Sequence, residues 1–153
     1  MKNYKRFIFT LVFLLIFGFV LYNELPKRGT FNSLALKKYS NIEFMRVMID
    51  YDSIHISSKD TDPLSKLLSY MKDFKLIEDK HLDYFPKEYN SIYAYAEDGS
   101  SLQIIIHTKN HIYVETYLNG GLQHRNYYKI IGDGLDMNYV QDLLKQFKSS
   151  ETM

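Results

Sequence analysis

The sequence predicts an α+β fold in which an N-terminal transmembrane helix precedes an antiparallel sheet of about five to six strands, with two helices on one face. Three observations support this prediction. An uncharged apolar run opens the chain, amphipathic helical patterns lie in its middle and at its end, and short alternating segments bounded by turn residues lie between them. We expect a β-hairpin, a helix, a meander of about three to four strands, and a closing helix.

The apolar run covers residues 7–22 and reads FIFTLVFLLIFGFVLY. It is just short of the roughly 20 residues that a helix needs to cross a bilayer, and the residues up to position 25 complete a thin span. Lys2, Lys5 and Arg6 precede the run and favour a cytoplasmic N-terminus. The chain is therefore predicted to be a single-pass protein of the cell membrane, anchored through residues 7–25, with an extracytoplasmic domain.

A cleaved signal peptide is the alternative, because a basic start followed by a short apolar segment also fits that class. The end of the run and the residues after it read VLYNELP, at positions 20–26, and contain no small-x-small cleavage site. The anchor is therefore preferred, and a secreted form of the same domain is the alternative. Residues 1–25 are assigned to the anchor or signal segment, 26–40 to a linker, 41–148 to the domain and 149–153 to a tail.

The domain is expected to begin with a hairpin and a helix. Residues 42–49 form one strand candidate, and residues 54–56 resume its alternation after a turn. Asp62 and Pro63 then mark a helix start, since aspartate is a good N-cap and proline suits the first helical position. Residues 77–90 show no clear period and are expected to form a loop.

Four further strand candidates follow, at residues 91–96, 102–107, 111–118 and 122–131. Asp98-Gly99 and Asn119-Gly120 are strong hairpin turn signals between them. The alternation of the last strand is hard to follow at Tyr127-Tyr128, where we expect a bulge. Asp136 then caps a closing helix with apolar residues at helical spacing.

This layout resembles that of short, N-terminally membrane-anchored extracytoplasmic proteins of Gram-positive bacteria that carry an α+β domain of unknown function. The features that carry the resemblance are the apolar anchor, the hairpin running into an Asp-Pro-capped helix, the strand after Tyr89, the Asp-Gly turn and the final amphipathic helix. The resemblance covers most of the chain and is one of layout only. It transfers no catalytic residue.

The composition argues against several classes of protein. The chain has no cysteine, which excludes disulfides, cysteine-based zinc sites and thiol catalysis. Its 19 basic and 18 acidic residues nearly cancel, so no nucleic-acid partner is expected. The sequence contains no nucleophile elbow, dinucleotide fingerprint or evident catalytic carboxylate pair. The chain is therefore predicted to be a binding protein without a cofactor and not an enzyme.

Alternation along the predicted meander places polar and aromatic side chains together on one face of the sheet. The apolar residues between them face the core, so this second face is expected to be open. The candidate partner-binding residues are Tyr93, Tyr95, Gln103, His107, His111, Tyr113, Glu115 and Tyr117. We expect a protein or cell-envelope partner there, or at the loop of residues 84–89. A purely structural role is the alternative, because cross-strand aromatic pairs stabilise a sheet without any ligand.

A metal site is the other functional alternative. His107 and His111 flank a short turn, and Glu115 or His124 is the third candidate ligand for zinc or copper. The spacing of the two histidines matches a helical zinc motif, but here it spans a turn and lacks the adjacent glutamate of that motif. No metal ligand is therefore assigned.

Overall fold

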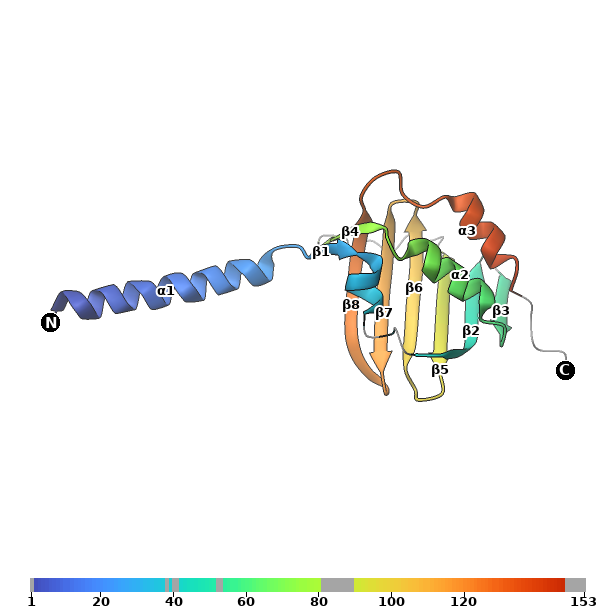
Figure 1. The fold of residues 1–153 in the computed structure, drawn as a ribbon, viewed down its shortest axis with the longest axis horizontal. Coiled ribbons are helices and arrows are strands. Elements are labelled where there is room, and N and C mark those ends of the chain that lie inside the picture. The colour runs from blue at the N-terminus through green and yellow to red at the C-terminus, as the bar shows by residue number, and fades with distance from the viewer. Residues whose placement is uncertain (1, 38, 40–41, 52–53, 81–89, 148–153) are drawn as a thin grey trace.

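The computed structural model describes residues 2–37, 39, 42–51, 54–80 and 90–147, so the candidate loop of residues 84–89 lies outside the described residues. Helix α1 (Lys2–Glu24) extends away from a folded domain that the later elements build (Figure 1). The domain contains an antiparallel sheet of eight strands. A π-helix, η1 (Asn32–Leu36), and two α-helices, α2 (Asp62–Met71) and α3 (Met137–Leu144), accompany the sheet.

The sheet has the strand order β1-β4-β8-β7-β6-β5-β2-β3. The strands are β1 (Arg28–Thr30), β2 (Phe44–Tyr51), β3 (Ile54–Ser58), β4 (Lys75–Glu78), β5 (Asn90–Ala96), β6 (Ser101–Thr108), β7 (His111–Leu118) and β8 (Gly121–Ile130). The β2–β3 hairpin joins the meander through β5, and β1 and β4 extend the opposite edge through β8.

The prediction of about five to six strands is wrong, because the sheet also contains β1 and β4. These strands have three and four residues, too few for an alternating pattern to be recognised in the sequence. They depend on partners far along the chain, since Leu76 of β4 pairs with Ile130 of β8. Part of the stretch expected to be a linker is therefore folded, and its Phe31 is fully buried.

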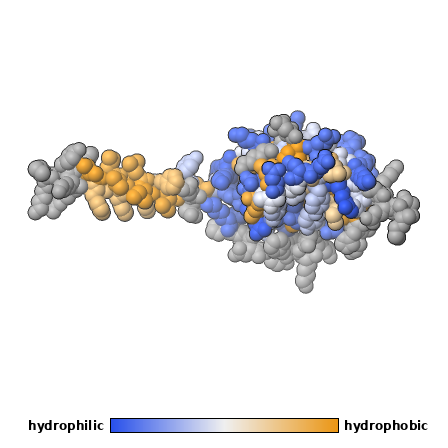
Figure 2. Space-filling view, turned by 90° about the horizontal axis from the view of Figure 1, so that it is seen from below, coloured by the Kyte–Doolittle hydropathy of each residue, from blue (hydrophilic) through white to orange (hydrophobic). Residues whose placement is uncertain are grey.

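The prediction of an N-terminal transmembrane helix is also wrong. The predicted single-pass location in the cell membrane, which depends on that helix, is wrong as well. No helix within the described part of the chain is long and apolar enough to cross a membrane. The uncharged run of residues 7–22 spans roughly 24 Å at about 1.5 Å per residue, short of a hydrocarbon core of about 30 Å, and its extension to residue 25 adds the polar Asn23 and Glu24. The apolar side chains of α1 from Ile8 to Tyr22 are at least 42% exposed, and they form a continuous apolar surface (Figure 2).

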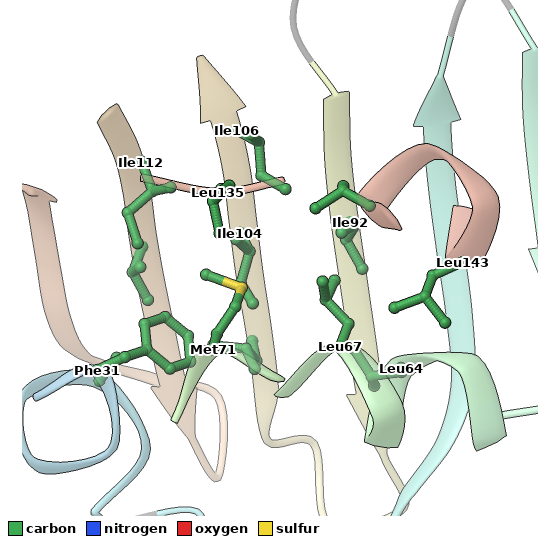
Figure 3. Close-up of a cluster of buried hydrophobic side chains, with 14 of the residues drawn as sticks. Phe31, Leu64, Leu67, Met71, Ile92, Ile104, Ile106, Ile112, Leu135 and Leu143 are labelled. Atoms are coloured by element: carbon green, nitrogen blue, oxygen red, sulfur yellow. The ribbon is translucent and has the colours of Figure 1, made fainter. Parts of the chain in front are cut away.

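The hydrophobic core lies between the sheet and its two α-helices. Alternate residues of the central strands, such as Ile92, Ile104 and Ile112, belong to the same buried cluster as Leu67 of α2 and Leu143 of α3 (Figure 3). Each such aliphatic side chain contributes roughly 1.5–3 kcal/mol when it is fully buried. Both helices therefore cover the same face of the sheet, and the polar and aromatic alternates of β5–β8 lie on the other face, which we call the polar face.

Two predictions from local sequence signals are confirmed, the turn at Asn119-Gly120 and the helix cap at Asp136. Asn119 and Gly120 both have positive φ, at 49° and 76°, which suits the tight turn between β7 and β8. The Asp136 carboxylate accepts hydrogen bonds from the backbone N–H groups of Asn138 and Tyr139, at 3.0 and 3.2 Å, and so caps α3. The prediction of Asp62 as the N-cap of α2 is wrong by one residue, because the N-cap is Thr61 and Asp62 is the first residue of the helix.

Candidate functional site

The register of the central strands aligns the predicted site residues in rows across the polar face. In one row, Tyr93 of β5 pairs with Gln103 of β6, and Gln103 pairs with Glu115 of β7. In the next row, Tyr95 pairs with Ser101, and Ser101 pairs with Tyr117. Side chains in neighbouring positions on the same face lie about 5 Å apart across the strands. The two rows therefore bring five of the eight predicted residues together.

These five residues line a cavity of about 240 Å³, which we call the tyrosine pocket. The lining residues are Tyr93, Tyr95, Ser101, Leu102, Gln103, Glu115 and Tyr117. Tyr95 is 38% exposed at the pocket, whereas Glu115 is only 6% exposed. The pocket therefore combines accessible phenol rings with a carboxylate that is largely removed from water.

The Glu115 carboxylate is held by hydrogen bonds from three neighbouring side chains. The hydroxyls of Tyr113 and Tyr117 each donate to one of its oxygens at 2.6 Å. The guanidinium of Arg125 donates from Nη2 at 2.6 Å and from Nε at 3.1 Å, both to Oε1. Short hydrogen bonds to an ionised group are about twice as strong as neutral ones. The carboxylate is therefore fixed in position beside the pocket.

These contacts also set the ionisation of the cluster. Burial by itself would raise the pKa of Glu115, but the hydrogen bonds from Tyr113, Tyr117 and Arg125 outweigh it and hold this pKa below its ordinary value. Burial and the bond to the carboxylate raise the pKa of the Tyr113 phenol. The bond to Glu115 likewise raises the pKa of Tyr117. Glu115 is therefore ionised at neutral pH, and both phenols keep their protons.

The backbone beneath the pocket is also tied down. Tyr39, in the segment after η1, is buried, and its hydroxyl donates to the carbonyl of Tyr117 at 2.6 Å and to that of Ser101 at 3.2 Å. These two residues belong to the pocket lining, on β7 and β6. The tyrosine pocket is therefore built on adjacent strands whose ends are joined by a third segment of the chain.

Sequence reasoning missed Arg125 because the register of β8 shifts at a bulge. Leu118 pairs with Gly121 and Tyr117 with Leu122, but Thr116 then pairs with His124 and Glu115 with Arg125. Without this shift, His124 would lie opposite Glu115, since one residue of slip moves a side chain to the other face. The expected bulge at Tyr127-Tyr128 lies instead near Gln123.

The same shift places His124 apart from the other candidate ligands of the alternative metal site. His124 lies toward the helix side of the sheet, where its ring contacts the Tyr128 hydroxyl and it lines a cavity with residues of η1. Glu115 is already engaged by Arg125. Within the described ranges there is no group of three histidine, aspartate or glutamate side chains that could hold a metal ion.

The remaining predicted residues lie farther along the polar face. The Tyr113 ring packs on Tyr127, with ring centres 4.8 Å apart, and Tyr127 lies 5.8 Å from the ring of His107. Burial, together with nearby His111, lowers the pKa of His107. His111 Nδ1 lies 3.2 Å from the Thr108 hydroxyl. Neither histidine lines the tyrosine pocket, and a binding role for both stays a prediction.

A larger cavity of about 440 Å³ lies on the helix side, between η1 and α2. Five of its ten described lining residues have purely apolar side chains, among them Leu36, Phe44 and Leu64, and the other five carry polar groups, with Glu43 as the carboxylate. The Tyr39 hydroxyl at its edge already donates to the carbonyls beneath the tyrosine pocket. The smaller pocket has the denser set of converging polar groups, and it is therefore the better candidate site.

Comparisons with models of protein families, with curated proteins and with solved structures find no match to this chain. The chemistry and geometry of the site are therefore the basis for proposing a function.

Proposed function

We propose that this protein is a non-catalytic binding domain that receives a side chain of a partner protein in the tyrosine pocket. The observation that carries the proposal is the convergence of three tyrosines on a fixed, buried carboxylate. Tyrosine gives a large contact area with a polar tip and few rotatable bonds, which is why it is frequent at binding surfaces.

The size of the pocket supports a protein partner. Pockets for drug-sized ligands have volumes of about 300–1,000 Å³, and the tyrosine pocket, at about 240 Å³, falls below that range. One protruding side chain suits such a volume. Interfaces commonly concentrate their binding energy in one or a few anchor residues that enter pockets of this kind.

The state of Glu115 supports a binding role over catalysis. A general acid or base works best when its pKa lies near the working pH. The pKa of Glu115 is instead held below its ordinary range by the surrounding donors. The other side chains that line the pocket are phenols, an amide, a serine and a leucine. The carboxylate therefore orients groups around it and does not exchange a proton at neutral pH.

Affinity capture from an extract of the source organism tests this function with three forms of the full chain. We expect the wild-type chain and Tyr139→Ala to retain the same partner protein, and Tyr95→Ala to lose it. Tyr139 is the matched control, because it is 41% exposed on α3, compared with 38% for Tyr95 on the polar face. Equal capture by all three forms, with each shown to be folded, would contradict the proposal.

A further inference from the structure

We infer that the tyrosine pocket binds the ammonium group of a lysine side chain of the partner protein. This inference rests on the proposed function and specifies its chemistry. The described residues that line the pocket include one carboxylate, three phenol rings and no basic side chain. A cation is stabilised both by an anionic carboxylate and by the faces of aromatic rings. Tyrosine-walled cages for ammonium groups use both of these attractions.

Arg125, the cation paired with Glu115, lies outside the lining of the pocket. It lies on β8, on the far side of Glu115 from the pocket, and it is not among the pocket-lining residues. Its side chain is 57% exposed, whereas that of Glu115 is 8% exposed. Water and salt screen an exposed charge more strongly than a buried one. The carboxylate of Glu115, and not the guanidinium of Arg125, therefore lines the pocket.

The hydrogen-bonding groups also suit an ammonium group. Tyr117 donates its hydroxyl proton to Glu115, and its oxygen, which also interacts with Arg125, keeps a lone pair that can accept from a ligand. The Gln103 side chain supplies a further carbonyl acceptor at the pocket. An ammonium group has three donors and no acceptor, and the apolar stem of lysine can lie along aromatic rings.

Lysine fits better than arginine for a geometric reason. Arginine prefers two parallel hydrogen bonds to the two oxygens of one carboxylate, and on Glu115 Arg125 already occupies Oε1 and Tyr113 occupies Oε2. The remaining acceptors are single oxygens on separate side chains. The compact ammonium group of lysine, whose donors can rotate, matches these separate acceptors more closely than the planar guanidinium group of arginine does.

Titration of the isotopically labelled full chain, followed by backbone amide chemical shifts, tests the inference. The probes are N-acetyl-lysine methylamide and its uncharged counterpart N-acetyl-norleucine methylamide. We expect the lysine probe to shift residues of β5, β6 and β7 around the pocket and to bind about tenfold more tightly than the norleucine probe. Added salt should weaken only the lysine probe. Tyr95→Ala should weaken its binding, and Tyr139→Ala should not.

A second titration, with choline and its neutral counterpart 3,3-dimethylbutan-1-ol, distinguishes a lysine side chain from a quaternary ammonium ligand. Tighter binding of choline than of the lysine probe would overturn the lysine assignment in favour of a quaternary ammonium ligand. Equal binding of lysine and norleucine probes, or no shift with the lysine probe, would overturn the inference. The proposed function would survive that result if partner capture still depended on Tyr95, so the two failures are distinguishable.

Discussion

At the scale of single residues, Glu115 determines the character of the site. It is a charged residue on a central strand, it is 6% exposed, and its partners come from β7 and β8. A buried charge is tolerated only when such partners satisfy it. The same bonds that stabilise the ion also fix the rings and the guanidinium around the pocket.

Replacing Glu115 by glutamine should therefore destabilise the domain. Glu115→Gln weakens the charge-assisted bonds from Tyr113 and Arg125, and we expect a loss of about 1–3 kcal/mol in urea unfolding at pH 7. Glu97→Gln, an exposed glutamate in the β5–β6 turn, should change stability by less than about 0.5 kcal/mol. Equal effects of the two changes would contradict the structural role of the Glu115 cluster.

The same variant should show a specific pH dependence. The pKa of Glu115 is lowered on folding, so its stabilisation is present above the unfolded-state value of about 4.3 and is lost as the pH falls through the folded-state value. The difference between wild type and Glu115→Gln should therefore be largest near neutral pH and shrink below about pH 4. A difference that grows in acid would be inconsistent with this cluster.

We expect His107 to give the stability of the domain a second pH dependence, closer to neutral pH. Burial lowers its folded-state pKa, so below about pH 6.5 the unfolded chain takes up a proton that the folded chain does not. Stability should fall as the pH drops from 7.5 to 5.5, by at most about 1.4 kcal/mol per pH unit from this group. His107→Gln should flatten the profile measured by urea unfolding. A profile unchanged by the substitution would rule out this assignment.

At the scale of elements, strongly periodic segments and turn signals could be predicted from the sequence, whereas short strands and exact register could not. The β7–β8 hairpin follows from Asn119-Gly120, and α3 from its Asp136 cap. The bulge that brings Arg125 to Glu115 has no local signature, because it is fixed by pairing with β7. Five of the predicted residues do line one pocket, but the cation beside its carboxylate was not foreseen.

The loop between β8 and α3 offers a test at this scale. Gly132 and Gly134 both have positive φ, but a Cβ on Gly134 would lie 2.5 Å from the Lys109 carbonyl oxygen, whereas one on Gly132 would meet nothing within 4 Å. Gly132→Ala should cost about 1 kcal/mol from backbone strain. Gly134→Ala should cost roughly 1–2 kcal/mol more, measured by thermal or urea unfolding. Equal losses in the free energy of unfolding would show that the close approach of the Lys109 carbonyl at Gly134 does not affect stability.

At the scale of the whole molecule, the fold separates a helix-covered face from a polar face. The described core residues begin at Phe31, so none of them comes from α1, which extends away from the domain (Figure 1). The sequence indicated a membrane span there from apolar composition, whereas the apolar run is too short to make one. The polar face, by contrast, places its aromatic residues on rigid strands, which is the arrangement that preorganised binding sites require.

The central claim is that partners bind at the tyrosine pocket on the polar face. Site-specific photo-crosslinking tests it most directly, with the same photoreactive phenylalanine derivative placed either at Tyr95 or at Tyr139. These positions have similar exposure, at 38% and 41%, and lie on opposite sides of the sheet. We expect irradiation in the source organism to give one discrete protein adduct from position 95 and none from position 139. An adduct from position 139 alone, or none from either position, would contradict the claim.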